Sequence, residues 1–225
     1  MNNGLRILKR RRAVDLELAR QFLDVPVANV SDCMSRMTAG GARLRPYHAG
    51  GRMAGPALTV KTRPGDNLMI HKALQMLQPG DVLIVDGGGE LTNSLIGEIM
   101  LGDAIVRQAG GVVINGAIRD AGEIAEMSMP VFAAGVTHRG PYKDGPGEIN
   151  VPIAIDGMVI EPGDLVIGDE DGVLCVPYDD VAGLLAAARA KQATEATMIA
   201  AIKNGTADRA WIDATLKRLN CYIEE

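Results

Sequence analysis

Aromatic residues, cysteines and long apolar runs are all scarce in this chain of 225 residues. Phe, Trp and Tyr make up only 3% of it, so stacking on nucleobases or sugar rings is not its expected means of recognition. The three cysteines, Cys33, Cys175 and Cys221, form no CxxC pair, which favours reduced thiols over a zinc knuckle or disulfide framework. No stretch approaches the roughly 18 apolar residues of a membrane helix, and no apolar segment follows the N-terminal charges as in a signal peptide. We expect a cytoplasmic protein without membrane contact.

An excess of positive charge is also lacking. The formal net charge is −5, so the summed field would repel phosphate backbones. One basic run, Lys9-Arg10-Arg11-Arg12, opposes this balance and could form a patch for an anionic partner. Because neither aromatic residues nor a second basic cluster accompany it, a solvated segment leading into the first helix is favoured. Nucleic acid is therefore not an expected partner.

Short apolar runs alternate with segments whose apolar residues recur at helical spacing. Helices are expected over 13–24, from a cap at Ser31, from a cap at Asp66 to about Leu77, over 93–109 and from Asp120 to about Met129. Strands are expected over 53–62, 82–85, 112–114 and 130–134, and the apolar run 82–85 is typical of a strand covered on both faces. The order strand, helix, strand over 82–114 predicts a parallel crossover.

The character of the chain changes to β from residue 149, where short apolar segments alternate with hairpin and tight-turn signals. Residues 179–219 are rich in alanine and read as helix, with an interruption at Asn204-Gly205. No linker divides the chain. We expect one mixed α/β domain over 1–225 with a parallel core and a β-rich second layer, a helical N-terminal segment (about 1–37) and a helical C-terminal extension (about 179–225).

The residues best suited to catalysis or metal binding follow two neighbouring strands of the expected sheet. Glu98 follows the first, and Arg119-Asp120 follow the second, so both fall near the carboxyl ends of strands, where ligands bind in open α/β sheets. Asp120 is the natural ligand for a hard cation such as Mg²⁺, with Glu98 and Glu123 as direct or outer helpers. Arg119 suits an anionic substrate because its planar fork matches a carboxylate or an enolate oxygen.

Three patterns in the sequence have a structural explanation beside the functional one. Asp120-Ala121-Gly122-Glu123 fits a helix capping box, and the residues alone favour neither this cap nor the metal site. Asp169-Glu170-Asp171 could be a second metal cluster, but the Asp171-Gly172 pair favours a hairpin turn. Cys175 lies in an apolar segment and is expected in the core.

The spacing from Glu98 to Arg119-Asp120 and Glu123 resembles the motif of the RraA-like family. This family unites the regulators of ribonuclease E activity with the 4-hydroxy-4-methyl-2-oxoglutarate / 4-carboxy-4-hydroxy-2-oxoadipate aldolases. The likeness extends over most of the chain and includes PGDN at 64–67 with His71, QPGD at 78–81, GE at 97–98, GAIRD at 116–120, PVFAAG at 130–135 and INVP at 149–152. The helical C-terminal extension, which the shorter regulators lack, makes the chain more similar to the aldolases.

The resemblance implies a layered α/β/β sandwich of the swivelling-domain type, assembled as a homotrimer or homohexamer. It also implies a pyruvate aldolase that depends on Mg²⁺, Mn²⁺ or another divalent cation and decarboxylates oxaloacetate as well. In this family pattern Asp120 ligates the metal and Glu98 supports its waters. Arg119 binds the keto oxygen of the oxo-acid substrate, and the backbone N–H groups of Ile99 and Met100, after Gly97, hold the pyruvate carboxylate.

The proton acceptor for the C4 hydroxyl is left open. Metal-bound water or hydroxide is the simplest candidate. In the aldolases a glutamate from the C-terminal helix of a neighbouring subunit assists, and Glu195 is the counterpart we expect, although a solvated helix face explains it equally well. His71 and Lys143 could meet a distal carboxylate of the substrate, whereas a lone histidine on a helix is more often structural.

Two classes of function remain after these considerations. The first is the metal-dependent aldolase, and the second is a non-catalytic regulator that binds a protein such as ribonuclease E. The intact set Glu98, Arg119 and Asp120 favours the enzyme, because pure protein binding does not need these three together. A methyltransferase is set aside, since the chain has no glycine-rich cofactor loop with an acidic residue closing the next strand.

Overall fold

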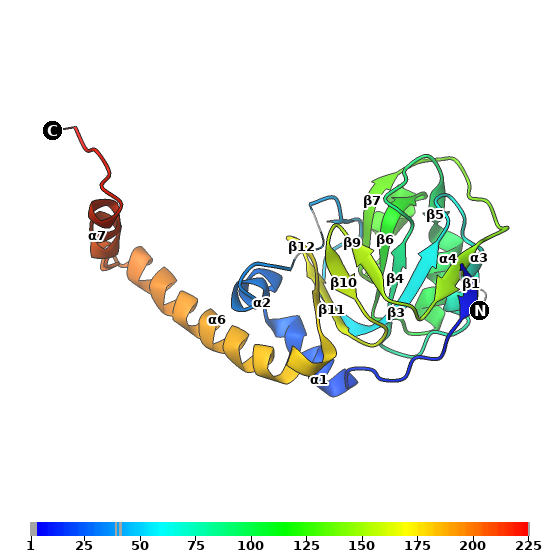
Figure 1. The fold of residues 1–225 in the computed structure, drawn as a ribbon, viewed down its shortest axis with the longest axis horizontal. Helices are drawn as coiled ribbons and strands as arrows, with labels where there is room; N and C mark the ends of the chain where they lie inside the picture. Colours follow the sequence, from blue (N-terminus) through cyan, green and yellow to red (C-terminus); the bar gives the residue numbers. More distant parts are fainter. Residues whose placement is uncertain (1–3, 39, 41, 225) are drawn as a thin grey trace.

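The computed structural model describes residues 4–38, 40 and 42–224, and its centre is a mixed β-sheet (Figure 1). The strand order is β1 (Leu5–Ile7), β8 (Gly147–Ile149), β3 (Met53–Thr62), β4 (Val82–Asp86), β6 (Gly111–Ile118), β7 (Val131–Val136) and β2 (Arg45–Pro46), with β5 (Ser94–Ile96) beside β6. Strands β3, β4, β6 and β7 run parallel to their neighbours in this series. The four predicted strands of the parallel core are confirmed, and β6 continues four residues beyond its predicted end at Ile114.

One face of the sheet is covered by helices α3 (Leu68–Leu74), α4 (Glu98–Val106) and α5 (Ala121–Ala125). Their buried side chains, such as Ile70 and Leu101, pack against Leu83 and Val85 of β4. The alternate residues of that strand, Val82 and Ile84, belong to a second core on the opposite face. Burial on both faces explains why β4 is apolar at every position from Val82 to Val85 and not only at alternate ones.

Two antiparallel hairpins cover the second face. They are β9 (Ile153–Ile155) with β10 (Met158–Ile160), and β11 (Leu165–Asp169) with β12 (Gly172–Val176), and β11 also pairs with the first half of β3. The predicted β character after residue 149 is confirmed. The turn interpretation of 169–171 is confirmed as well, because the Asp169 carboxylate accepts hydrogen bonds from the N–H groups of Asp171 (3.0 Å) and Val27 (2.9 Å). Cys175 is buried in this core, as predicted.

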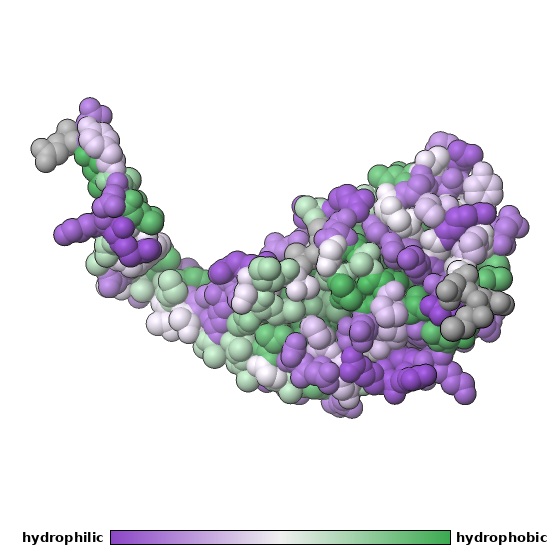
Figure 2. Space-filling model, viewed as in Figure 1, coloured by the Kyte–Doolittle hydropathy of each residue, from purple (hydrophilic) through white to green (hydrophobic). Residues whose placement is uncertain are grey.

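Helices form an outer layer on the β11–β12 hairpin. They are α1 (Leu16–Arg20), the 3-10 helix η1 (Gln21–Asp24), α2 (Val27–Cys33) and, after the short η2 (Tyr178–Asp180), the first turns of α6 (Val181–Lys203). The buried residues of α6 end at Ala188, but Lys191 and Glu195 still contact α2. The remainder of the helix projects from the body of the molecule and carries α7 (Ala210–Arg218) at its far end (Figure 1). The space-filling view shows the same arm projecting from the body, with apolar and polar side chains both on its surface (Figure 2). The helix ends next to Asn204-Gly205, as predicted, and the layers follow the expected α/β/β order.

Several predicted helix boundaries were wrong. Helix α2 begins at Val27, directly after Pro26, so Ser31 lies in its last turn instead of capping it. The predicted helix 93–109 begins only at Glu98, because Ser94–Ile96 pair with β6 as a buried strand. Three helices are shorter than expected: α3 spans Leu68–Leu74, α4 ends at Val106 and α5 ends at Ala125. Apolar periodicity alone is a weak guide to such boundaries, because tertiary context overrides it.

The N-terminal segment differs from its prediction as an all-helical region. Residues 5–7 pair with β8, and an extended stretch follows until α1 begins after Asp15. The basic run in this stretch is not simply solvated: the Arg10 side chain is 12% exposed and lies 2.7 Å from the Asp81 carboxylate. Burial raises the pKa of Asp81 although Arg10 opposes that rise. No helix in the described part of the chain has both the length and the hydropathy needed to cross a bilayer.

Candidate active site

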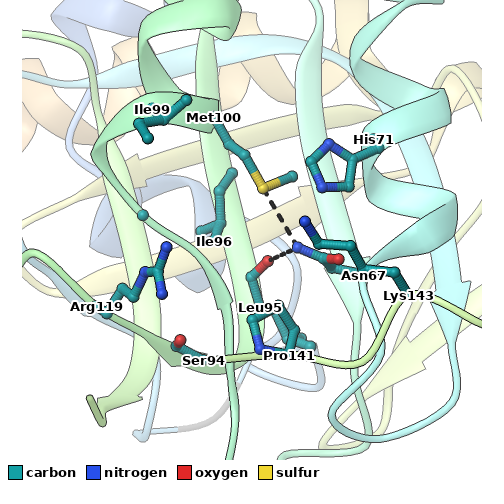
Figure 3. A pocket seen from close by; sticks show the side chains of 11 residues that line it. Asn67, His71, Ser94, Leu95, Ile96, Ile99, Met100, Arg119, Pro141 and Lys143 are labelled. Atoms are coloured by element: carbon teal, nitrogen blue, oxygen red, sulfur yellow. Dashed lines mark hydrogen bonds between the residues drawn. The ribbon is translucent and has the colours of Figure 1, made fainter. Parts of the chain in front are cut away.

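A cavity of about 130 Å³ opens at the carboxyl ends of β5 and β6 (Figure 3). All six residues predicted to bind substrate line it, namely His71, Gly97, Ile99, Met100, Arg119 and Lys143. Asn67, Ser94, Leu95, Ile96 and Pro141 complete the wall. The structure therefore brings together residues from α3, β5, α4, the end of β6 and the loop after β7, which lie far apart in the sequence.

The turn from β5 into α4 forms one side of the cavity. Gly97 has an extended backbone (φ −147°), so its role concerns space: a Cβ there would collide with the Asp120 carboxylate and the Arg119 side chain. In the described part of the chain, the N–H groups of Ile99 and Met100 in the first turn of α4 have no acceptor. Free N–H groups and the positive end of the helix dipole make this turn suited to an anion.

Arg119 and Asp120 follow β6 and face this turn. Asp120 has a left-handed backbone (φ 58°), which aspartate tolerates better than most residues, and its side chain does not cap α5. The capping-box interpretation of 120–123 is therefore wrong. Instead, Oδ2 of Asp120 accepts a hydrogen bond from the N–H of Glu98 at 3.0 Å and lies 3.7 Å from Nε of Arg119. That 3.7 Å contact leaves the terminal nitrogens of Arg119 open to the cavity (Figure 3).

The three carboxylates considered as metal ligands do not form one cluster. Within the described residues, no group of three His, Cys, Asp or Glu side chains is placed to hold a metal ion. Glu98 and Glu123 are not buried, and Glu98 contacts Asp120 through its backbone N–H, not its carboxylate. Asp120 keeps its Oδ1 without a partner in the described part, on a side chain that is 36% exposed. The single carboxylate of Asp120 fits Mg²⁺, which often takes one or two carboxylates and retains several waters. A site in which Asp120, Glu98 and Glu123 all bind the ion does not fit the structure.

Asn67, His71 and Lys143 form the opposite wall, and Figure 3 shows the three side chains close together. Asn67 is buried and donates to the Leu95 carbonyl at 3.0 Å, while its Oδ1 has no partner in the described structure. Burial, and then the nearby Lys143 charge, lower the pKa of His71, so its imidazole is neutral at pH 7. The functional potential of Asn67 was missed in the sequence, although it is the last residue of the PGDN motif; only its burial and orphaned oxygen reveal it.

Glu195 does not reach the cavity of its own chain. It lies on α6, where its carboxylate accepts hydrogen bonds from Asn29 (2.7 Å) and pairs with Lys191 (3.1 Å). The Asn29 contact joins α2 to α6, whereas Lys191 lies one turn away on α6 itself, and both contacts lower the pKa of Glu195. Glu195 is thus neither a freely solvated residue nor part of this chain's site, and its role toward a neighbouring subunit stays a prediction.

Comparison with known proteins agrees with this architecture. The profile of the RraA-like family, described as Aldolase/RraA, matches residues 27–175. A candidate 4-hydroxy-4-methyl-2-oxoglutarate aldolase of Halalkalibacterium halodurans is 36% identical over 200 residues, which cover 88% of this chain and 95% of that protein.

Two solved structures are similar over most of their length. An uncharacterized protein from Pseudomonas syringae pv. tomato has a TM-score of 0.76 at 26% identity, covering 86% of this chain and 95% of its own. The RNA-processing inhibitor RraA from Thermus thermophilus has a TM-score of 0.64 at 32% identity, covering 68% of this chain and 93% of its own. The sequence match and the shared fold agree with the motifs read from the sequence. The chain therefore belongs to the RraA-like family.

Proposed function

We propose that this chain is a divalent-metal-dependent lyase. It cleaves a 4-hydroxy-2-oxo-dicarboxylate to pyruvate and a second oxo acid, and it decarboxylates oxaloacetate at the same site. The observation that carries the proposal is the convergence of three groups complementary to one pyruvate unit around the cavity. These are the free N–H groups of Ile99 and Met100 and the open guanidinium of Arg119, which line the cavity, and the carboxylate of Asp120, which lies beside Arg119 outside the lining. The aldolase name of the Halalkalibacterium halodurans relative supports the same class of reaction.

The first turn of α4 would bind the carboxylate of the pyruvate unit. A carboxylate at this position satisfies two backbone donors that otherwise have no acceptor in the described chain. The helix dipole adds to this attraction. Since Gly97 has no side chain, the carboxylate can approach the turn while Asp120 remains against Glu98.

Arg119 would bind the keto oxygen that becomes an enolate oxygen when the bond between C3 and C4 breaks. Fixed positive charge aimed at an oxygen that gains charge lowers the barrier, and this effect is among the largest in enzyme catalysis. Asp120 would hold Mg²⁺ or Mn²⁺ through its open Oδ1. When bound, the cation supplies Lewis-acid charge beside the same oxygen.

The opposite wall would bind the part of the substrate beyond pyruvate. Lys143 offers a positive charge to the distal carboxylate, and the orphaned Oδ1 of Asn67 is an acceptor for the C4 hydroxyl. Among the residues that line the cavity, neutral His71 can accept the proton of that hydroxyl, because the side chains of Lys143 and Arg119 offer hydrogen-bond donors and no acceptor.

The alternative function is regulation by protein binding. It draws on the RNA-processing inhibitor RraA of Thermus thermophilus, whose fold this chain shares. A regulator of that kind does not require free helix N–H groups and an open arginine to face one small cavity. The geometry therefore favours the enzyme.

Release of pyruvate separates the two functions. A lactate dehydrogenase-coupled assay would be run with oxaloacetate and with 4-hydroxy-4-methyl-2-oxoglutarate, first with Mg²⁺ and then with excess EDTA. The proposal expects turnover of both substrates that EDTA abolishes and added Mg²⁺ restores. If neither substrate were turned over with Mg²⁺ or with Mn²⁺, the enzyme proposal would be overturned. Unchanged turnover in Asp120→Ala would overturn the assignment of the site.

A further inference from the structure

Three Pro-Gly-Asp turns occur in the chain, at 63–66, 78–81 and 161–164, and their backbones are alike. In each turn the N–H of the aspartate donates to the carbonyl three residues earlier, at 3.0, 3.0 and 3.1 Å for Asp66, Asp81 and Asp164. The glycine of each turn has a positive φ, of 76°, 85° and 91° respectively. The three turns share one backbone conformation, so the hydrogen bonds of their aspartate side chains can be compared directly.

In two of the turns the carboxylate closes the turn to which it belongs. Asp81 accepts from the N–H of Gln78 at 3.0 Å, and Asp164 accepts from the N–H of Glu161 at 2.9 Å. Asp66 departs from this pattern. The equivalent N–H group, that of Arg63, donates to the Pro146 carbonyl at 3.1 Å, so it is not available to the Asp66 carboxylate.

The Asp66 carboxylate instead holds the loop that carries Lys143. Its Oδ2 accepts from the N–H groups of Asp144 and Gly145, both at 2.8 Å. On the other side of Lys143, Tyr142 exchanges backbone hydrogen bonds with the same turn: its N–H donates to Gly65 at 2.8 Å and its carbonyl accepts from Asn67 at 3.0 Å. The backbone is thus fixed on both sides of Lys143.

The same carboxylate also sets the start of α3. Its Oδ1 accepts from the N–H of Leu68 at 3.0 Å, and α3 carries His71 while Asn67 directly precedes it. Asp66 is completely buried, with Nη2 of Arg63 at 3.2 Å as its counter-charge. Hydrogen bonds to a buried carboxylate are among the strongest available to a loop. One side chain therefore couples both elements that build the distal wall of the cavity.

We infer that Asp66 is a positioning residue that holds Lys143 in register with Asn67 and His71. Through them it sets the affinity for the part of the substrate beyond the pyruvate unit. This inference rests on the proposed function. The first turn of α4 and Arg119, which serve the pyruvate unit, make no contact with Asp66 among the interactions described above. Asn67 links the two halves of the cavity through Nδ2, which donates to the Leu95 carbonyl (3.0 Å) and the Met100 sulfur (3.4 Å), so loss of the Asp66 carboxylate should act first on the distal half.

The test compares Asp66→Asn with Asp164→Asn, a matched control for a buried aspartate that closes its own turn away from the cavity. Two activities are measured for each protein with Mg²⁺: solvent exchange of the pyruvate methyl protons, and cleavage of 4-hydroxy-4-methyl-2-oxoglutarate. Asp66→Asn should raise KM for cleavage about tenfold, with methyl exchange within about twofold of wild type, because one charged acceptor for two N–H groups is lost. Asp164→Asn should leave both parameters near those of wild type.

Lys143→Ala and the double variant complete the test. Because part of the effect of Asp66 passes through Lys143, Asp66→Asn should cost less in the Lys143→Ala background than in the wild-type protein. Multiplied losses in the double variant would overturn the inference, and so would equal losses of methyl exchange and cleavage in Asp66→Asn.

Amide hydrogen exchange gives a readout that does not depend on activity. In the wild-type protein the N–H groups of Asp144 and Gly145 should exchange slowly, and Asp66→Asn should accelerate both. Fast exchange of both groups in wild type would overturn the inference even if the variant failed to fold. If the wild type had no aldolase or exchange activity, the proposed function would fail, while slow amide exchange would still uphold the role of Asp66 in fixing the loop.

Discussion

The backbone N–H of Glu98 donates to Oδ2 of Asp120 at 3.0 Å, across 22 residues of sequence. This bond ties the end of β6 to the first turn of α4. It occupies the first donor of the helix and leaves the N–H groups of Ile99 and Met100 open to the cavity. It also holds Asp120 away from α5, with its second oxygen uncommitted in the described structure. One carboxylate thus shapes the anion subsite and offers a ligand for a cation.

Gly97→Ala should abolish most of the activity without unfolding the protein. Its Cβ would meet the Asp120 carboxylate and the Arg119 side chain, and displacement of catalytic groups by about 1 Å can cost about 100-fold in rate. Gly102→Ala is the matched control, because Gly102 lies on the same helix and a Cβ added there would meet no atom within 4 Å. It should keep full activity and gain up to about 1 kcal/mol of helix stability. Equal activity of the two variants would show that space beside Gly97 is unimportant.

Asp120→Asn should separate the two uses of this side chain. Asparagine tolerates the left-handed backbone and can still accept the Glu98 N–H, but it lacks the charge that attracts a cation. We expect a loss of about 100- to 1,000-fold in kcat/KM with nearly unchanged thermal stability. Titration with Mn²⁺, followed by electron paramagnetic resonance, should show weakened binding. Binding of Mn²⁺ as tight as in wild type would place the metal elsewhere.

The pH dependence of cleavage should report on His71. Because burial and Lys143 lower its pKa, protonated His71 becomes abundant only at pH values below the usual 6.5, and the acid limb of kcat/KM should lie there. Lys143→Met removes one of these causes, so the acid limb should move toward higher pH even though KM rises. The profiles of wild type, Lys143→Met and His71→Gln would be compared. An acid limb that persists unchanged in His71→Gln would assign it to another group.

Glu195→Gln should destabilise the contact between α2 and α6 in a pH-dependent way. The pKa of Glu195 is lowered by Asn29 and Lys191, so its stabilising effect is complete above the unfolded value of 4.5 and is lost as the pH falls below it. Urea unfolding at pH 7 should therefore show a weaker variant, and the difference should disappear well below pH 4.5. Glu126→Gln, an exposed glutamate on the other side of the sheet, should match wild type at both pH values.

The strands could be predicted because their signals are local, and part of the cavity because its residues resemble a family motif. The apolar run 82–85 is a strand in any fold that buries both its faces. The motif identified the lining residues Gly97, Ile99, Met100 and Arg119, and His71 and Lys143 were separate candidates for a distal carboxylate. Asn67 and Asp66 could not be predicted as site residues in this way. Their roles depend on hydrogen bonds to Leu95, Asp144 and Gly145, which only the tertiary fold brings near.

The errors in the predicted helix boundaries also arise because tertiary contacts are not visible in the sequence. The segment 94–96 has apolar residues that suit a helix as well as a strand, and pairing with β6 decides the outcome. The capping-box pattern at Asp120 was compatible with the sequence, but the nearby N–H of Glu98 competes for the carboxylate. Likewise, Arg10 belongs to a basic run that looks solvated until Asp81, 71 residues away, is brought against it.

Exchange of the pyruvate methyl protons with D₂O is the most direct test of the proposed site, because it requires the enolate that Arg119 and a cation at Asp120 would stabilise. Pyruvate has neither a C4 hydroxyl nor a distal carboxylate, so binding of those groups by the distal wall does not enter the measurement. Proton NMR would follow the methyl signal with wild type, Arg119→Ala and Gly102→Ala, each with Mg²⁺ and with EDTA. The methyl signal should disappear with wild type and Gly102→Ala in Mg²⁺ only, and it should persist with Arg119→Ala. A signal that persists with wild-type protein and Mg²⁺, or that is lost equally fast with Arg119→Ala, would show that no enolate forms at this site.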